Sequence, residues 1–290
     1  MRKRWTLAHI EDLVMRILMI LSSMALVLIL AAILASIFIK GLPAMNLDLI
    51  TKTPEGGFFL GGEGGVLNAI VGSLLLAGGG TLLAFLISLP IAFGINVYTS
   101  GTPRGIRLAS FFRLTLDVLW GIPSLVYGAF GFTIMIALGL RASLGAGILV
   151  LTLLEIPIMV RAMDEVMRLV PEDLTFAALG VGATRLEAAR GVIIRQTLPG
   201  LVTAVLLAFG RGIGDAASVL FTAGFSDRIP TSLGNAAASL PLAVFFQLGS
   251  PFPEVRARGY ASALILTVLI LLISLISRAL ARRLSRNVIK

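Results

Sequence analysis

Long stretches of this chain carry no charged side chain, and short segments rich in arginine, glycine or proline separate them. Asp, Glu, Lys and Arg are all absent from residues 17–39, 64–103, 118–140 and 259–277, which are runs of 23, 40, 23 and 19 residues. A helix needs about 20 mostly apolar residues to cross the hydrocarbon core of a bilayer. The pattern therefore predicts an all-α, polytopic membrane protein.

Six membrane spans account for this hydropathy once prolines and glycines are used to place the connections. They cover about residues 13–39, 66–99, 118–140, 146–160, 197–223 and 259–280. The first is longer than the apolar core of a cleavable signal peptide, which has about 7 to 15 residues, so we expect it to stay in the protein. Residues 225–258 hold four prolines, and we expect a loop with a short or re-entrant helix there.

The chain divides into three parts on this pattern. Residues 1–65 hold an N-terminal tail, the first span and a glycine-rich extracytoplasmic loop. Residues 66–284 form the transmembrane core, which includes a polar loop at 171–196. Residues 285–290 are expected to form a basic cytoplasmic tail. Within the core, the polar residues of 106–119 are spaced like one face of a helix approaching the membrane.

The distribution of basic residues predicts the orientation of the spans. With six spans, both ends of the chain lie on one side, and the segments on that side hold 17 of the 24 Lys and Arg residues. The opposite side holds six, and Arg211 lies within a span. Because cytoplasmic loops carry an excess of Lys and Arg, both termini and the loop at 161–196 are predicted to be cytoplasmic. The net charge of +9 is thus a topology signal and predicts no nucleic-acid partner.

The composition excludes several classes of protein. Hydrophobic residues make up 57% of the chain and charged residues 13%, whereas soluble domains have roughly 25% charged residues. No cysteine is present and His9 is the single histidine, which excludes a disulfide framework, a Cys-based metal site and a Ser-His-Asp triad. None of the four lysines lies in a P-loop. Any ATP-driven step must therefore come from another subunit, and we expect no cofactor bound by this chain.

Two charges lie inside the predicted fifth span. A charge at the centre of a membrane helix costs about 2.5 to 3.5 kcal/mol, and Arg211 and Asp215, four residues apart on one helical face, can neutralise each other. They either face a hydrophilic path, where the arginine attracts an anion, or form a structural ion pair. Glu155 is a second buried acid, either structural or a cross-helix partner for Arg211. Arg161 lies where an arginine anchor at the membrane edge is expected.

The polar loop begins like a helix that contacts another protein. Pro171 is followed by Glu172 and Asp173, as at a helix N-terminus. Small and apolar side chains follow along the expected helix, which covers about 172–190: Phe176, Ala177, Ala178, Gly182 and Ala183. Such a helix can fit a groove on another protein, or it can lie on the lipid surface as a connector.

This loop resembles the EAA loop of binding-protein-dependent ABC importer permeases, because Ala177, Ala178 and Gly182 are placed as in that motif. Further segments resemble the phosphate-import branch of the family: GLPA at 41–44, GFFLGGEGG at 57–65, IVGSL at 70–74, GIPSLVYG at 121–128, EIPIMVR at 155–161, RLVP at 168–171, ALGVGAT at 178–184, RGIGDA at 211–216 and LFTA at 220–223. The likeness runs from about residue 41 to the end of the sixth span.

The resemblance implies a type I, MetI-like fold and the permease subunit of an ATP-driven phosphate importer that works by alternating access. It implies coupling to the ATPase through Glu172, Asp173, Phe176, Ala177, Ala178, Gly182 and Ala183. The candidates for the translocation path or an intramembrane charge pair are Arg211, Asp215, Glu155 and Arg161. The implied partners are a homologous second permease, two ATPase subunits and an extracytoplasmic phosphate-binding protein, in the cell membrane of a prokaryote.

The chain departs from the family pattern at three places. Phe176 stands where the EAA signature has glutamate, and Leu198 with Pro199 arrives four residues after 192–195, the place of the family's I-x-L-P pattern. We expect these two departures to change how the loop is held. The acid four residues after the span arginine is usually glutamate in the family, and Asp215 is one methylene shorter, which changes its pairing geometry.

Other functions compete with phosphate import. A permease of the same architecture for sulfate, molybdate or an amino acid fits the composition equally well, and a stand-alone channel fits the spans but needs no ATPase-docking loop. The segment 212–215 matches the G-x-G-D motif of intramembrane aspartyl proteases, whose two carboxylates share a proton, but the sequence contains no Tyr-Asp pair to supply the second. A rhomboid-like serine protease needs a histidine in the spans, and they contain none.

Overall fold

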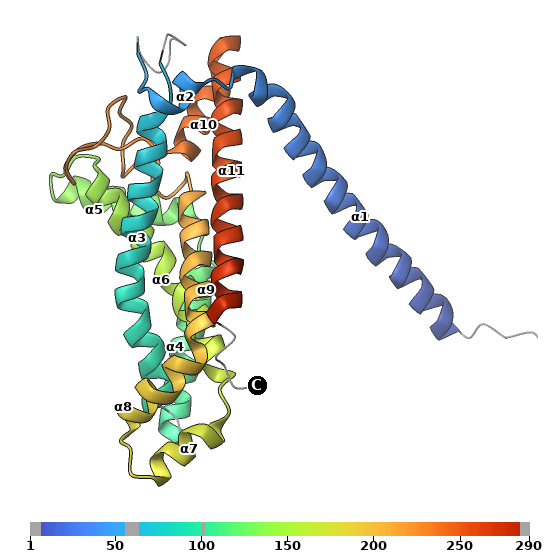
Figure 1. Cartoon of the computed structure of the whole chain (residues 1–290), viewed down its shortest axis with the longest axis vertical. Helices are drawn as coiled ribbons and strands as arrows, with labels where there is room; N and C mark the ends of the chain where they lie inside the picture. The colour runs from blue at the N-terminus through green and yellow to red at the C-terminus, as the bar shows by residue number, and fades with distance from the viewer. Residues whose placement is uncertain (1–6, 56–63, 100–101, 285–290) are drawn as a thin grey trace, which may run out of the picture.

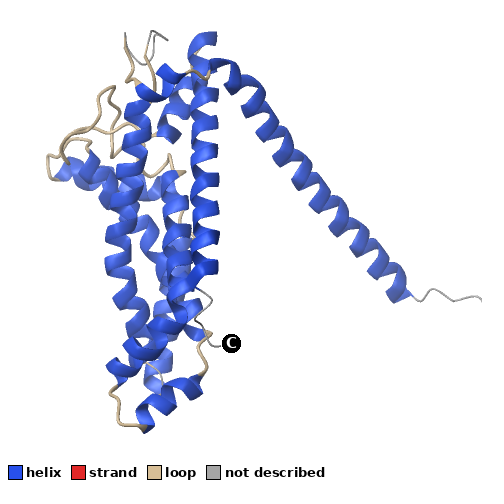
Figure 2. Cartoon of the chain, in the orientation of Figure 1, coloured by secondary structure: helices blue, strands red, loops and turns tan. Residues whose placement is uncertain are grey.

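The computed structural model describes residues 7–55, 64–99 and 102–284. Within these ranges the regular elements are helices, apart from an isolated β-bridge between Pro54 and Gly64 (Figure 2). The helices are α1 Leu7–Gly41, the 3₁₀ turn η1 Leu42–Ala44, α2 Leu47–Thr51, α3 Leu67–Phe93, the π-helical turn η2 Gly94–Tyr98, α4 Pro103–Trp120, α5 Ser124–Ala137, α6 Leu144–Arg168, α7 Glu172–Gly180, α8 Arg185–Ala188, the π-helical turn η3 Ala189–Ile193, α9 Ile194–Ile213, α10 Leu240–Leu248 and α11 Pro253–Leu284. The predicted tail at 285–290 lies outside the described residues.

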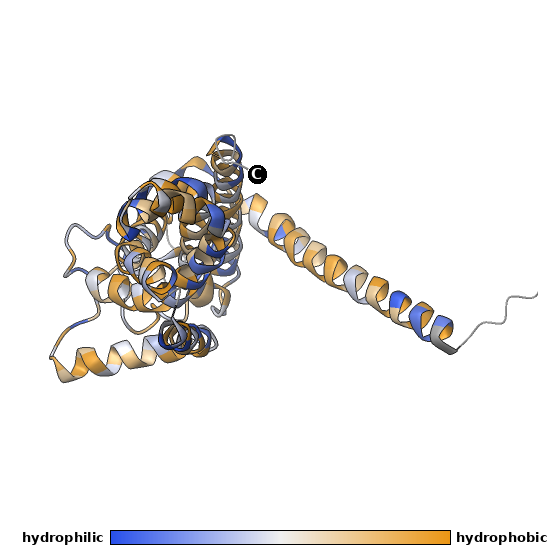
Figure 3. Ribbon diagram, turned by 90° about the horizontal axis from the view of Figure 1, so that it is seen from below, coloured by the Kyte–Doolittle hydropathy of each residue, from blue (hydrophilic) through white to orange (hydrophobic). Residues whose placement is uncertain are grey.

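Four long helices, α3, α6, α9 and α11, form an elongated bundle (Figure 1). Helices α2 and α10 lie at one end of the bundle, and α7 and α8 lie at the other. Helix α1 contacts α11 near the C-terminal end of α1, where Gly41 lies against the backbone of Tyr260. The rest of α1 stands away from the bundle (Figure 1). Its residues are mostly hydrophobic, and it stands apart from the bundle in the view from below as well (Figure 3). Most of its apolar side chains are exposed.

Five helical segments are long and apolar enough to cross a membrane, and a bent pair can supply a sixth span. The five contain α1, α3, α6, α9 and α11, which agrees with the predicted all-α, polytopic class. The span predicted over 118–140, the third in chain order, is not one continuous helix. Helices α4 and α5 meet there at 91°. The break falls at Gly121 to Pro123, because Pro123 lacks a backbone N–H and disfavours a helical conformation at the residue before it.

The predicted span over 197–223 also ends early. Helix α9 stops at Ile213, and the chain continues in turns before α10. Glycine costs about 1 kcal/mol in a helix relative to alanine, and three glycines alternate at this point: Gly210, Gly212 and Gly214. Asp215 then stabilises the turn, since its Oδ2 accepts a hydrogen bond from the backbone N–H of Ser218 at 2.8 Å.

The two long connections outside the polar loop contain short helices. The segment 225–258, predicted as a loop with a short helix, contains α10, and Ser239 caps its N-terminus. Helix α11 begins at Pro253, six residues before the predicted start, because proline and the following Glu254 favour the first helical turn. The described part of the connection 40–65 contains η1 and α2, which Asn46 caps.

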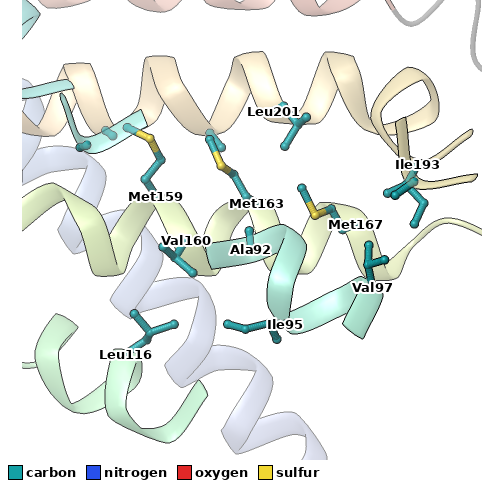
Figure 4. Packing of buried hydrophobic residues seen from close by; sticks show 14 of the residues in the cluster. Ala92, Ile95, Val97, Leu116, Met159, Val160, Met163, Met167, Ile193 and Leu201 are labelled. Atoms are coloured by element: carbon teal, nitrogen blue, oxygen red, sulfur yellow. The ribbon is translucent and has the colours of Figure 1, made fainter. Parts of the chain in front are cut away.

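Methionines fill the core between the long helices at the α7 end of the bundle. Met159, Met163 and Met167 lie four residues apart on α6 and are buried (Figure 4). They belong to one apolar cluster with Ala92 of α3 and Leu201 of α9. Unbranched methionine side chains fill irregular gaps, and small residues let membrane helices approach closely. The packing therefore fixes α6 as the central helix of this region.

At Gly72 the backbone of α3 lies directly against the segment before α10. We predict that Gly72→Ala destabilises the protein. A Cβ atom at this position would lie 1.9 Å from the backbone carbonyl oxygen of Ala238. Overpacking of this kind costs about 1 to 3 kcal/mol. The matched control is Gly78→Ala on the same helix, where a Cβ atom would meet nothing within 4 Å. Thermal unfolding in detergent should show a lower midpoint for Gly72→Ala alone, and equal midpoints would contradict the packing.

Candidate functional site: an intramembrane charge cluster and a helical loop

The predicted charge pair forms at the end of α9. Arg211 Nη1 lies 2.9 Å from Asp215 Oδ1. The Asp215 side chain is only 3% exposed, whereas that of Arg211 is 45% exposed. Both carboxylate oxygens of Asp215 are engaged, one by Arg211 and one by the backbone of Ser218. The acid is therefore a fixed, buried partner, and the arginine extends from it toward open space.

Arg211 keeps hydrogen-bonding capacity beyond this pair. A guanidinium has five N–H donors in a planar fork that matches oxyanions. Within the described part of the chain, the bond to Asp215 is the hydrogen bond that this side chain makes. Chemically, the site can therefore hold an anion against Arg211 while Asp215 keeps the guanidinium in place.

Glu155 lies next to this pair but does not join it. Its side chain is fully buried on α6, and a Cβ atom at Gly212 of α9 would lie 2.0 Å from its Oε1. Neither carboxylate oxygen has a hydrogen-bond partner among the described residues. In this structure Arg211 pairs with Asp215 and not with Glu155, and the role of Glu155, which the sequence left open, stays a prediction. Glu155 remains a buried acceptor without a partner in the described chain.

Arg161 belongs to a separate ion cluster that joins α6 to α4. Its Nε lies 2.7 Å from Asp117 Oδ1, and its Nη1 lies 3.3 Å from Asp164 Oδ2. Asp164, which is fully buried, also accepts two bonds from Arg113, at 2.8 and 2.9 Å, and one from Asn96 at 2.9 Å. Arg161 is only 18% exposed. It is therefore a half-buried link between α6 and α4 and has no contact with the Arg211 pair; its place at the membrane edge stays a prediction.

Sequence reasoning missed Arg113, Asp117 and Asp164. The spacing of Arg161 and Asp164 on one helical face was a local signal, since residues three apart are neighbours on a helix. The link to Arg113 and Asp117 joins positions about fifty residues apart, and hydropathy patterns carry no signal for such a contact. Within the described ranges, no group of three or more His, Cys, Asp or Glu is placed to hold a metal ion.

The polar loop forms two short helices where one was predicted over 172–190. Helix α7 begins directly after Pro171, as predicted, and ends at Gly180. The backbone of Gly182 has φ +93°, a conformation that L side chains rarely adopt, so the chain turns there. Thr184 and Glu187 then form a capping box that starts α8. From there the helix continues through η3 into α9.

The loop residues predicted to couple to another protein lie at one end of the molecule (Figure 1). Asp173, Ala177 and Gly182 are exposed, and Phe176 is 62% exposed. Ala178 and Ala183 are half-buried, and Glu172 is the first residue of α7. Helix α1 starts and α11 ends toward this same end. The described loop therefore presents an unpartnered, partly apolar surface on the side toward which α1 begins and α11 ends.

A bundle of membrane-spanning helices with an intramembrane arginine and an exposed helical loop at one end is the architecture expected of a membrane transport permease. A family model described as "Binding-protein-dependent transport system inner membrane component" matches residues 91–290. The chain belongs to this family, whose members are transport components, and it is not an enzyme.

Relatives and solved structures agree with this assignment. The chain is 32% identical over 247 residues to the "Phosphate transport system permease protein PstA" of Haemophilus influenzae, covering 85% of each chain. It is 34% identical to the protein of that name from Xylella fastidiosa, covering 84% of this chain and 83% of the relative. An inward-facing structure of the MetNI methionine ABC transporter aligns with a TM-score of 0.63 at 20% identity, covering 76% of this chain and 95% of that one. A bacterial alginate ABC transporter, solved with its pentasaccharide-bound periplasmic protein, gives 0.63 at 15% identity, covering 99% and 100%. These two structures share the MetI-like permease fold.

Proposed function

We propose that the chain is one permease subunit of an ATP-driven phosphate importer. The observation that carries the proposal is the match to phosphate transport permeases along most of the chain, at 32 to 34% identity over 84 to 85% of it. The exposed guanidinium of Arg211, held by Asp215, supports the same solute, since a planar donor fork matches the oxygens of phosphate. The protease alternative lacks its second carboxylate, because Glu155 lies beside Gly212 without joining the Asp215 pair.

The chain is expected to form half of the pathway, with a homologous second permease as the other half. An apolar groove of about 560 Å³ between α3 and α9, together with the exposed side chains of α1, supports a helical partner within the membrane. Two ATPase subunits and an extracytoplasmic phosphate-binding protein complete the assembly. The alginate transporter, whose structure includes its periplasmic protein, supports this kind of partner. ATP and Mg²⁺ are expected on the ATPase, and no cofactor on this chain.

Coupling is proposed to pass from the exposed loop to Arg211 along one continuous helical segment. Residues Arg185–Ile213 form an unbroken segment of 29 residues, which at 1.5 Å per residue is about 43 Å long. The capping box of Thr184 and Glu187 stands at one end of this segment and Arg211 at the other. A push by the ATPase on α7, through Asp173, Phe176, Ala177 and their neighbours, therefore displaces the segment that carries the arginine. Alternating access follows from rocking of the bundle around this midplane charge.

The loop surface also supports an orientation for the protein in the membrane of a prokaryotic cell. ATP is cytoplasmic, so docking of an ATPase on α7 places this end of the bundle in the cytoplasm. Both ends of the chain then lie in the cytoplasm, as the count of basic residues predicts. The connection 40–65 and the segment around α10 then face the binding protein outside the cell.

Solute uptake separates phosphate from the closest alternative, a permease of the same architecture for sulfate, molybdate or an amino acid. We expect that the chain, expressed in cells lacking their own phosphate permease, restores uptake of radiolabelled phosphate. Excess unlabelled sulfate or molybdate should not compete. Uptake of sulfate or molybdate without uptake of phosphate would contradict the proposed solute and leave the permease class intact.

A further inference from the structure

A second basic site lies between the bundle and the coupling loop. It is at the opposite end of the helical segment Arg185–Ile213 from Arg211. It is a cavity of about 560 Å³ enclosed by η2, α4, the end of α6, α7 and the start of α8. Three arginines from three separate elements line it: Arg113 on α4, Arg168 at the end of α6 and Arg185 at the start of α8. No aspartate or glutamate occurs among the described residues that line it.

Two of the three arginines, Arg168 and Arg185, are not neutralised by an ion pair within the described ranges. Arg113 is neutralised by its two bonds to Asp164, which lies behind the cavity wall. Arg168 and Arg185 are also exposed. The cavity therefore carries an excess positive charge.

Two acids near the cavity already have partners. Asp164 is shared between Arg113 and Arg161, and Oε2 of Glu187 accepts hydrogen bonds from the backbone N–H and the hydroxyl of Thr184, both at 2.8 Å. Phe176 lines the cavity at the position where the EAA signature has glutamate. The described lining of the cavity therefore contains no acid that neutralises Arg168 and Arg185.

We propose that this cavity binds a phosphate-bearing anion through Arg168 and Arg185. Arginine forks bind phosphate oxygens in a bidentate manner with charge-assisted hydrogen bonds. Sites for small molecules have volumes of about 300 to 1,000 Å³, so this cavity has room for a phosphate group with further atoms attached. The hydroxyl-bearing Thr175 and the apolar Phe176 and Leu179 of α7 also line the cavity. Inorganic phosphate or the headgroup of an anionic phospholipid supplies this chemistry.

A bound anion would join the loop to the bundle. Arg168 ends α6, and Arg185 starts the helical segment that continues into α9. An anion bound by both arginines therefore connects the two ends of the loop that contains α7. This consequence for coupling rests on the proposed docking of α7 on an ATPase. Anion binding itself does not depend on the transported solute.

The test uses the transporter purified through this chain, in phosphatidylcholine nanodiscs without the binding protein. One arm measures binding of radiolabelled inorganic phosphate by equilibrium dialysis. The other adds spin-labelled phosphatidylglycerol to the nanodiscs and measures the immobilised lipid fraction. We expect a saturable component in at least one arm, weakened about a hundredfold in the double variant Arg168→Gln, Arg185→Gln, since each charge-assisted bond contributes about tenfold or more.

The matched control is Arg190→Gln with Arg195→Gln, which removes two exposed arginines from the same segment that do not line the cavity. This variant should bind as the natural chain does, and phosphate held at Arg211 is unaffected in both variants. A component that the double variant Arg168→Gln, Arg185→Gln weakens in the phosphate arm alone identifies the free ion, and one that it weakens in the lipid arm alone identifies the headgroup. No saturable component in either arm, a component that the double variant leaves unchanged, or equal loss in the control would overturn the proposal. Transport of a different solute would overturn the proposed function but leave this result standing.

Discussion

Replacing Arg211 with glutamine is expected to abolish phosphate uptake while the complex still assembles in the membrane. The substitution removes the partly exposed guanidinium that Asp215 holds in place. A charge-assisted hydrogen bond is worth about 1.5 to 3 kcal/mol, so the loss of two such bonds to phosphate lowers uptake about a hundredfold or more. Radiolabelled phosphate uptake and co-purification of the partner subunits measure the two effects separately.

Two further variants distinguish transport from structure. Arg211→Gln leaves Asp215 buried without its partner, which is costly in itself, so the double variant Arg211→Gln, Asp215→Asn removes that unpaired charge. If the arginine serves transport, the double variant assembles well and still fails to take up phosphate. Arg195→Gln, at the opposite end of α9, should transport normally. Restored uptake in the double variant would show that the pair is structural and that Arg211 does not contact the solute.

Substituting Gly182 with valine is expected to uncouple transport from docking of the ATPase without preventing membrane insertion. A Cβ atom there would meet nothing within 4 Å, so the substitution acts through the backbone φ of +93°. Non-glycine residues in such conformations cost about 1 to 3 kcal/mol. The turn that sets α7 against the capping box at Thr184 is therefore distorted, and phosphate-stimulated ATP hydrolysis and uptake should both fall about tenfold or more.

Gly180→Val is the control, because Gly180 lies two residues away at the end of α7, with open space around it and an ordinary backbone conformation. We expect nearly normal coupling in this variant. Equal impairment of both variants would indicate that added bulk on the docking surface, and not the turn, is responsible. Normal uptake with Gly182→Val would contradict the assignment of this loop to coupling.

The sequence predicted the elements whose signal is local. The span that became α3 and the one that became α11 are long uninterrupted apolar runs, which only a membrane helix accommodates. The start of α7 after Pro171 follows from capping chemistry, which acts within one turn. The pairing of Arg211 with Asp215 needs only the four-residue spacing, and it persists although the helix ends between them.

The sequence did not predict features that depend on direction or on distant contacts. Hydropathy reports how many apolar residues follow one another, but not whether the helix continues straight, so the 91° bend between α4 and α5 appeared as a single span. The ion cluster around Asp164 joins residues from η2, α4 and α6. The sequence left open whether Glu155 also pairs with Arg211, because that contact depends on how α6 and α9 pack and not on local spacing.

Phosphate-stimulated ATP hydrolysis tests the central claim most directly, because it requires the solute, the coupling loop and the partner subunits together. The complex is purified through this chain, rebuilt in lipid and supplied with its candidate binding protein. The proposed function predicts that phosphate-loaded binding protein raises the rate of ATP hydrolysis and that sulfate does not. An ATPase that co-purifies but ignores phosphate would contradict the solute, and the absence of a co-purifying ATPase would contradict the role of α7 as the coupling helix.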